Sequence, residues 1–165
     1  MAAVWALKVA RALSSGVRGA RALSSGVPGS PWQLGRLSHV AVAVPEMESA
    51  RAFYRDVLGG RVGEPLALPD HGVRAAFVEL GGARLELLEP LGDGSPILGF
   101  LRRNPAGGLH HICLEVDRLA AALQQLRARG VRTLSPQPRL GAHGKPVIFL
   151  HPKDCGGVLL ELEEA

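Results

Sequence analysis

The sequence has 165 residues, 47% of them hydrophobic, and a formal net charge of +4 at pH 7. Five of its nineteen basic residues but none of its fifteen acidic ones lie in residues 1–36, so the remaining chain is close to neutral. Because only 4% of the residues are aromatic and no apolar run reaches the roughly 18 residues of a membrane span, we expect neither nucleic acid nor a membrane as a partner. The two cysteines, Cys113 and Cys155, are too few for a disulfide framework and fit a reducing compartment.

The first 33 residues have the composition of a mitochondrial transit peptide. They are rich in Ala, Arg and Ser, and the first acidic residue of the chain is Glu46. The octapeptide ARALSSGV at 10–17 recurs at 20–27, a slip that a folded segment rarely tolerates. We therefore predict that residues 1–33 are a disordered or cleaved presequence for the mitochondrial matrix, with cleavage between about 20 and 35. A disordered tail that is retained is the alternative.

The first half of the mature chain has the pattern of one βαβββ module. Residues 36–44, RLSHVAVAV, alternate as a strand that ends at Pro45, and residues 46–58 place apolar side chains at helical spacing. Three further strands are predicted, over residues 61–68, 73–80 and 83–90.

The second half repeats this order. A strand is expected over 109–116, followed by a helix over 117–130 with Asp117 as its N-cap and Gly130 as its stop. The last three strands are expected over residues 131–137, 146–152 and 157–164. We predict a single domain over residues 34–165, made of a module at 36–90, a linker with a short helix at 91–107 and a module at 108–164.

The two halves align residue on residue at their first and last strands. LSHVAVAV lies on LHHICLEV, which pairs His39 with His111, and GGARLELLE lies on GGVLLELEE, which pairs Glu86 with Glu161. An internal repeat of this kind fixes the architecture. The prediction is an α+β fold in which two βαβββ modules place their sheets side by side in a curved, half-open barrel.

The aligned residues are a candidate metal site. Strand alternation puts His39 on the face of Ala41, puts His111 on the face of Cys113, and turns His110 the other way. Two buried carboxylates need a cation, and imidazole with carboxylate suits Zn, Mn, Fe, Co or Ni. Such an ion would keep two positions open and polarise a carbonyl as a Lewis acid. The alternative is that the histidines are hydrogen-bonded core residues and the glutamates lie on a solvated sheet face.

The paired modules, with His and Glu on these strands, resemble the vicinal oxygen chelate superfamily, which includes glyoxalase I and the extradiol dioxygenases. More narrowly, RLSHVAVAVP, GGLHHICLEVD and GKPVIFLHPKDCGGVLLELE resemble the methylmalonyl-CoA epimerases of animal mitochondria. The resemblance covers about residues 34–165, and the last of the three stretches is the most specific.

The resemblance implies an enzyme that interconverts (2R)- and (2S)-methylmalonyl-CoA through a metal-stabilised enolate in propionyl-CoA catabolism, acting as a homodimer. It implies a divalent metal, Co²⁺ as the first choice and Mn²⁺, Ni²⁺ or Zn²⁺ as alternatives. The metal ligands implied are His39, His111, Glu161 and Glu86, the last standing where bacterial relatives often have Gln. Glu161 and Glu86 are also the candidate acid–base pair. Ala75 stands where some bacterial relatives have Glu, so the second acid–base group stays open.

Two other functions remain open on the same scaffold. One is a glyoxalase-like lyase or a dioxygenase. A dioxygenase would require Fe held by only three protein ligands, and a charged fourth ligand at Glu86 disfavours that reading. The other is a metal-free small-molecule-binding module, which needs no recurring His and Glu. Apart from the four aligned residues, His71 is expected to be solvated, and His143 and His151 are expected in loops. Four basic residues are candidates for the phosphates of CoA: Arg102, Arg103, Lys145 and Lys153.

Overall fold

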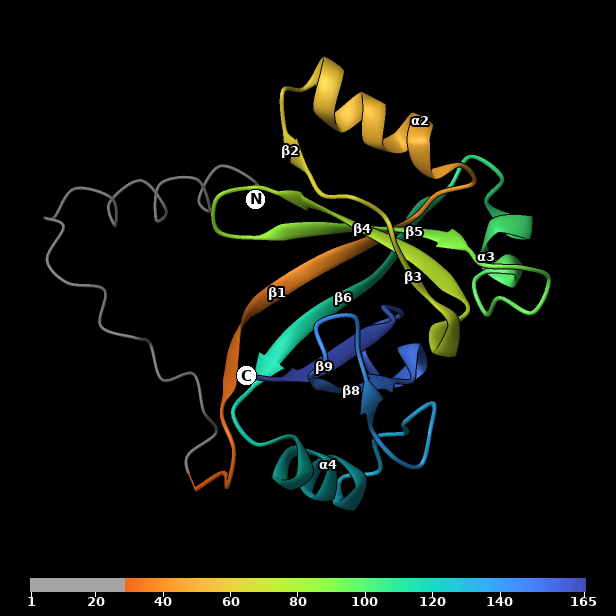
Figure 1. Cartoon of the computed structure of the whole chain (residues 1–165). Coiled ribbons are helices and arrows are strands. Elements are labelled where there is room, and N and C mark those ends of the chain that lie inside the picture. Colours follow the sequence, from red (N-terminus) through yellow and green to blue (C-terminus); the bar gives the residue numbers. More distant parts are fainter. Residues whose placement is uncertain (1–28) are drawn as a thin grey trace, which may run out of the picture.

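The computed structural model describes residues 29–165, so the predicted presequence lies almost wholly outside the described residues. One curled, nine-stranded sheet runs through the described chain in the order β2-β4-β5-β1-β6-β9-β8-β7, with β3 also paired to β4 (Figure 1). The predicted α+β fold of two βαβββ modules is confirmed. The first module holds β1 (Leu34–Ala43), α2 (Met47–Ala52), β2 (Arg61–Val62), β3 (Leu66–Leu68), β4 (Val73–Glu79) and β5 (Arg84–Pro90). The second holds β6 (Gly108–Val116), α4 (Leu119–Ala128), β7 (Arg139–Leu140), β8 (Pro146–Leu150) and β9 (Leu160–Glu164), and α3 (Leu98–Arg103) lies in the linker.

The two modules join at their first strands, which makes the sheet nearly symmetric about that seam. β1 and β6 are antiparallel neighbours, and each has the last strand of its own module, β5 or β9, as its parallel neighbour on the other side. Residues that align in the two halves of the sequence therefore occupy corresponding places in the sheet. The two predicted pairs of side chains come from the four central strands.

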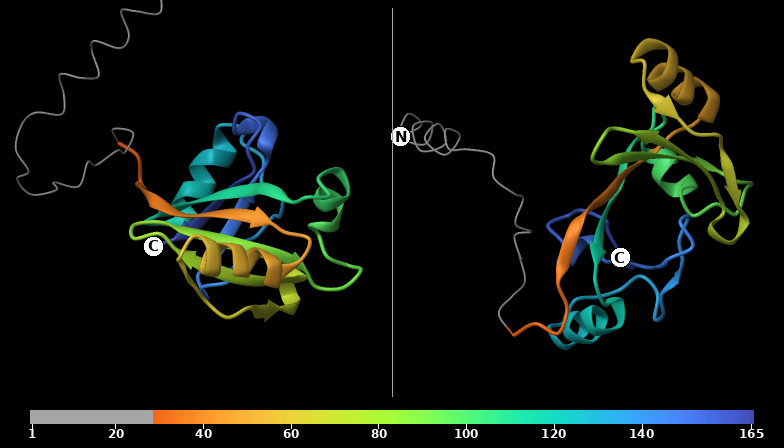
Figure 2. Two further views of the ribbon diagram at one scale, coloured as in Figure 1. Left: turned by 90° about the horizontal axis from the view of Figure 1, so that it is seen from above. Right: turned by 60° about the vertical axis from the view of Figure 1, so that its left-hand side comes forward.

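Helices α2 and α4 cover the convex side of the sheet at opposite ends of the molecule (Figure 2). Met47 of α2 packs against Val78 and Leu87, and Leu119 of α4 packs in a second cluster with Ile148 and Leu162. Because strand side chains alternate between faces, the residues on either side of Leu87 and Leu162 point to the concave side. Burial of the apolar clusters under the helices thus fixes which side chains line the hollow of the sheet.

Several predicted elements differ in extent for local reasons. The second strand of the first module splits into β2 and β3 at Pro65, which has no N–H to donate to β4. The strand predicted over 131–137 does not form. That proline-interrupted segment contributes one isolated bridge, between Thr133 and Leu150. Asp117 does not cap α4 and instead accepts a hydrogen bond from the backbone N–H of Gln33, 2.7 Å away. The helix of the first module continues beyond α2 as one π-helical turn, Phe53–Val57.

The described chain is already anchored before β1 begins. The indole Nε1 of Trp32 donates to the side-chain oxygen of Gln125 in α4 at 2.6 Å, and the hydroxyl of Ser30 donates to the same oxygen at 3.2 Å. Trp32 also packs against the apolar cluster beneath α4. Residues 30–33 therefore take part in the folded structure.

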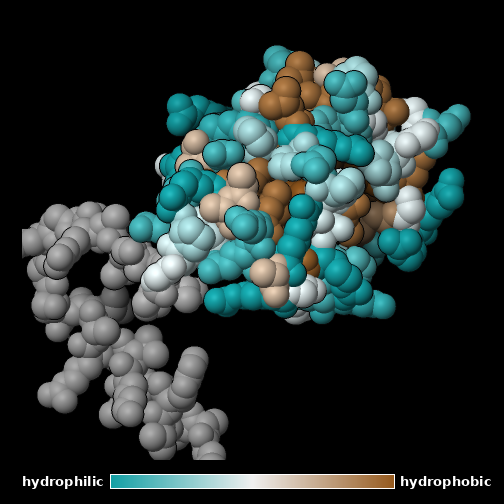
Figure 3. Space-filling model, turned by 90° about the horizontal axis from the view of Figure 1, so that it is seen from below, coloured by the Kyte–Doolittle hydropathy of each residue, from teal (hydrophilic) through white to brown (hydrophobic). Residues whose placement is uncertain are grey.

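No helix within residues 29–165 has the length and apolarity that crossing a membrane requires. The face shown in Figure 3 is largely hydrophilic, with hydrophobic residues exposed in smaller areas between the polar ones.

Gly107 is fixed by a close approach to the backbone of β1. Its φ is +85°, and a Cβ placed there would lie 2.5 Å from the carbonyl oxygen of Ala43. We expect Gly107→Ala to lower the free energy of unfolding by roughly 2–4 kcal/mol, because both the backbone conformation and the clash are unfavourable. Thermal denaturation measures this. Gly92→Ala is the control, since Gly92 also has a positive φ but a Cβ placed on it would meet no atom within 4 Å, and equal melting temperatures would contradict the prediction.

Candidate active site

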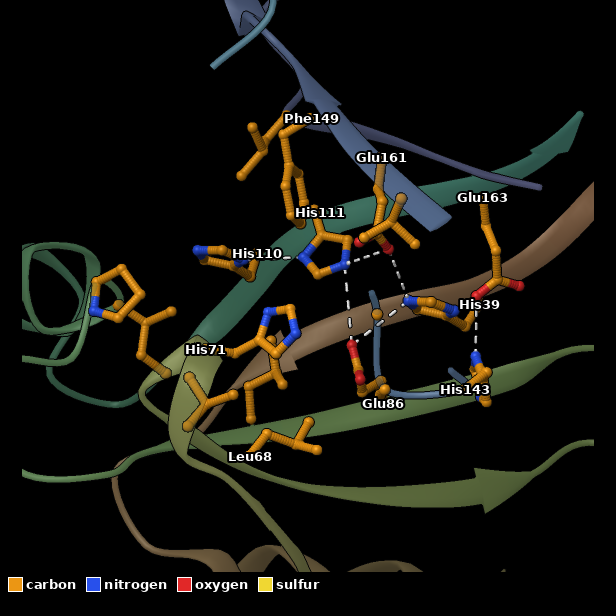
Figure 4. Close-up of a pocket in the computed structure, with 18 of the residues that line it drawn as sticks. His39, Leu68, His71, Glu86, His110, His111, His143, Phe149, Glu161 and Glu163 are labelled. Atoms are coloured by element: carbon orange, nitrogen blue, oxygen red, sulfur yellow. Dashed lines mark hydrogen bonds and ion pairs between the residues drawn. The ribbon is translucent and has the colours of Figure 1, made fainter. Parts of the chain in front are cut away.

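The concave side of the sheet holds a pocket of about 270 Å³ that both modules line. Its floor carries four buried polar side chains and its walls are largely apolar (Figure 4). The apolar wall residues include Leu68, Val73, Leu88, Ile97, Val147 and Phe149. A concave, mostly apolar pocket with a few convergent polar groups is the usual form of a small-molecule site.

The four residues that align in the repeat meet on this floor. His39 Nε2 lies 3.4 Å from Oε2 of Glu86 and 3.4 Å from Oε2 of Glu161. His111 Nε2 lies 3.8 Å and 3.4 Å from the same two oxygens. Each of the four residues is at most 6% exposed. The sequence-predicted set is therefore brought together from four different strands, with Glu86 and Glu161 approaching from opposite modules (Figure 4).

Small residues make room for this convergence. Ala41 lies between Glu86 on β5 and His111 on β6 in the sheet register, and Cys113 lies between His39 on β1 and Glu161 on β9. Neighbouring residues in register share a face, so larger side chains at these two positions would fill the space between the polar groups. The thiol of Cys113 is fully buried, and burial together with the charge of Glu161 raises its pKa, so it stays protonated.

The imidazoles and carboxylates of the four residues stabilise one another's charged forms. Burial by itself lowers the pKa of His39, but the carboxylates of Glu161 and Glu86 outweigh it and raise that pKa to about 9. Burial likewise raises the pKa of Glu161, but His111 and His39 bring it down to about 2. Nε2 of each histidine is buried without a hydrogen-bond partner. Two unpartnered imidazole nitrogens facing two carboxylate oxygens are a donor set that fits a divalent transition metal.

Each site histidine is preceded by a bulged residue. The register of β1 and β6 shifts at Ser38 and again at His110, so each strand has one extra residue there. His110 therefore does not point away from the site, as strict alternation predicted. It lines the pocket, and its Nδ1 lies 2.9 Å from Nδ1 of His111. Burial and the neighbouring His111 lower the pKa of His110 to about 4, so the ring is neutral at pH 7.

Two histidines outside the strands also line the pocket, and strand periodicity did not reveal them. His71 was expected to be solvated, but its Nε2 lies 2.5 Å from the carbonyl oxygen of Leu140 in the other module. His143 contacts Glu163 through Nδ1 at 3.0 Å and Arg84 through Nε2 at 2.9 Å. The contacts of His71 with Leu140 and of His143 with Arg84 join segments about 60 residues or more apart in sequence, and no local pattern signals them.

The remaining candidates lie elsewhere. Ala75 is 2% exposed and packs in an apolar cluster, so it supplies no acid–base group. His151 accepts a hydrogen bond from the backbone N–H of Lys153 and does not line the pocket. The four basic residues proposed for CoA phosphates are also absent from the pocket lining.

Comparison with known proteins places this site in a family. Residues 38–149 match the model of the Glyoxalase/Bleomycin resistance protein/Dioxygenase superfamily, which defines the class of the fold and its pocket. The mitochondrial methylmalonyl-CoA epimerase of Bos taurus is 61% identical over 137 residues, 83% of this chain and 78% of the relative. The ethylmalonyl-CoA/methylmalonyl-CoA epimerase of Cereibacter sphaeroides is 58% identical over 132 residues, 79% of this chain and 98% of the relative.

A solved structure agrees with these relatives. A methylmalonyl-CoA epimerase in complex with methylmalonyl-CoA and NH4+ superposes with a TM-score of 0.74 at 35% identity, covering 80% of this chain and 95% of the other. The chain therefore belongs to the glyoxalase superfamily and, within it, to the methylmalonyl-CoA epimerase family. The family resemblance drawn from the sequence is confirmed.

Proposed function

We propose that this protein epimerises methylmalonyl-CoA by moving the proton on the carbon between the thioester and the carboxylate. The observation that carries the proposal is the buried cluster of His39, His111, Glu86 and Glu161 in a chain 61% identical to a methylmalonyl-CoA epimerase. Neither a lyase or dioxygenase nor a metal-free binding module is favoured, since the epimerase relatives cover most of the chain and the buried carboxylates call for a cation.

Epimerisation needs a proton acceptor on one face of the carbon and a donor on the other. Glu86 comes from the first module and Glu161 from the second, so a substrate on the pocket floor has one carboxylate on each side. Oε2 of each carboxylate is the oxygen that contacts the histidines, which leaves Oε1 to take or give the proton. We infer that these two residues form the acid–base pair. The largely apolar wall of the pocket would keep bulk water from the deprotonated carbon.

We also propose that the same four residues hold a divalent metal, with Co²⁺ as the first choice and Mn²⁺, Ni²⁺ or Zn²⁺ as alternatives. The support is the group of His39, Glu86 and His111, whose ligand atoms all lie within 4.8 Å of one another, together with Oε2 of Glu161 at 3.4 Å from Nε2 of each histidine. The two Nε2 atoms are also unpartnered. When bound, such an ion supplies a Lewis acid that stabilises negative charge on the substrate oxygens. Each histidine would bind the ion as a neutral imidazole through Nε2, because its Nδ1 already has a partner outside the four residues.

Conversion of a single pure epimer, followed by chiral separation, tests the proposed function. We expect equilibration of the two epimers, loss of activity after exhaustive treatment with chelator, and recovery with Co²⁺. A protein that holds the metal and leaves a pure epimer unchanged would contradict the function.

The proposed location is the mitochondrial matrix, with the transit peptide within residues 1–33. The animal relatives are named mitochondrial, and the N-terminal segment is basic and free of acids. Because Ser30 and Trp32 contact α4, we place the cleavage site upstream of Ser30. We further propose that residues 34–165 form a single domain and that the protein is a homodimer. Light scattering of the purified protein would test the oligomeric state.

A reporter fused to residues 1–36 checks the location. We expect import into mitochondria, because an arginine-rich segment without acids is what the import machinery recognises. The matched control replaces Arg11, Arg18 and Arg21 by Glu and should leave the reporter in the cytosol. If the unaltered fusion stays in the cytosol, the transit-peptide prediction is wrong.

A further inference from the structure

The two bulged residues make the same kind of contact with the two site histidines. Ser38 precedes His39, and its hydroxyl lies 3.2 Å from His39 Nδ1. His110 precedes His111, and its Nδ1 lies 2.9 Å from His111 Nδ1. In a regular strand, adjacent side chains would point to opposite faces and could not meet in this way. The bulges in β1 and β6 therefore place a polar atom on the outer nitrogen of each imidazole.

The contacts of Ser38 extend to a buried carboxylate. Its hydroxyl donates to Oε1 of Glu163 at 3.3 Å, and Glu163 is 2% exposed on the same strand as Glu161. Since the only hydrogen of the serine hydroxyl is given to Glu163, its oxygen is left to accept from His39. In the neutral form that can bind a metal, His39 must then carry its hydrogen on Nδ1, which leaves the lone pair of Nε2 directed into the site.

The hydrogen bonds continue from the other oxygen of Glu163 through His143 to Arg84. Arg84 has only donors, so its N–H donates to His143 Nε2 at 2.9 Å, and the hydrogen of His143 lies on Nδ1. That hydrogen is donated to Oε2 of Glu163 at 3.0 Å. Every hydrogen in the chain from Arg84 to His39 has one acceptor, so the network defines one tautomer for each ring.

His110 has the corresponding role in the second module. If Nε2 of His111 is to present a lone pair to the site, its hydrogen lies on Nδ1 and is donated to Nδ1 of His110. His110 then carries its own hydrogen on Nε2. The ring of Phe100, 5.2 Å away between centroids, packs edge-on against His110.

We propose that Ser38, acting with Glu163, and His110 are positioning residues that orient His39 and His111 with Nε2 ready to bind metal. The inference rests on the proposed metal site. Partners on the outer nitrogen of a metal-bound histidine set its tautomer and orientation, and their loss typically costs about 10–100-fold in metal affinity. Here the sequence pairs Ser-His and His-His at equivalent places in the two modules, so each module supplies one histidine and its own orienting group.

The test is Co²⁺ binding with proton NMR of the Co²⁺-loaded protein. In the wild type we expect one tight Co²⁺ site and two strongly shifted, solvent-exchangeable signals, one from each Nδ1–H. Ser38→Ala should weaken Co²⁺ binding by about 10–100-fold and remove or broaden one signal. Ser38→Thr keeps the hydroxyl and should restore both affinity and signal. His110→Phe keeps a ring but removes the acceptor, and should affect the other signal.

The control is Ser95→Ala, because Ser95 is also a buried serine but its hydroxyl has no partner among the described residues. It should leave Co²⁺ binding unchanged. Wild-type affinity with both signals intact in Ser38→Ala would overturn the inference while leaving the metal site standing. If Ser38→Ala does not fold, Glu163→Gln takes its place, and wild-type Co²⁺ affinity in that variant would overturn the role of the carboxylate. A wild type that binds no Co²⁺ would overturn the metal site and this inference with it.

Discussion

His111→Ala is expected to lose tightly bound divalent metal and to lower epimerase activity by about 1,000-fold or more. The imidazole is 5% exposed, and its Nε2 lies 3.4 Å from Oε2 of Glu161 and 3.8 Å from that of Glu86. Without it, the two carboxylates keep a single imidazole, His39, opposite them. Metal content per chain by elemental analysis, measured beside the rate of epimer conversion, tests both parts of the expectation.

His151→Ala is the matched control for this variant. His151 is also a histidine of the second module, but it lies outside the pocket and accepts only from the backbone N–H of Lys153. We expect it to keep metal and activity. A His111→Ala protein that retains one metal ion per chain and full activity would show that the ligand assignment is wrong.

Glu86→Gln and Glu161→Gln are expected to lower the rate of epimer conversion by about 100- to 10,000-fold, the usual contribution of a general acid or base. Because the two carboxylates face the substrate from opposite modules, the variants should differ in which epimer still exchanges its proton. Each should fail to deprotonate the epimer whose hydrogen faces the missing carboxylate, and should still exchange the other epimer slowly. NMR of each pure epimer in deuterated water separates the two cases.

Metal content must be measured in both variants, since each residue is also a proposed ligand. Glu79→Gln is the control, because Glu79 is an exposed carboxylate at the end of β4, outside the pocket. Loss of exchange from both epimers to the same extent, in variants that still hold metal, would contradict the assignment of one carboxylate to each face. His71 and His110, which also line the pocket, would then become the next candidates for the second proton carrier.

The repeat made the floor of the site predictable. Aligning the halves paired His39 with His111 and Glu86 with Glu161, and period-two alternation put each glutamate opposite its leucine neighbours. The structure has these leucines under the helices, as Leu87 and Leu162 show. Strand alternation combined with an internal repeat was enough because β1 pairs with β5, and β6 with β9, in continuous register.

The surroundings of the two histidines were not predictable in the same way. A bulge inserts one residue into a strand and reverses the alternation beyond it, and neither Ser38 nor His110 carries a local signal such as glycine that would mark one. His110 was therefore assigned to the wrong face. The contacts of His71 and His143 depend on how the two modules curl toward each other, which only the tertiary structure determines.

Proton exchange tests the central claim most directly. The Co²⁺-loaded protein is incubated with a pure epimer of methylmalonyl-CoA in deuterated water, and the α-proton signal and the epimer ratio are followed by NMR with and without chelator. We predict that deuterium replaces the α-proton as the epimers interconvert and that chelator stops both processes. Absence of exchange at any metal loading, or exchange that chelator leaves untouched, would contradict a metal-dependent epimerase.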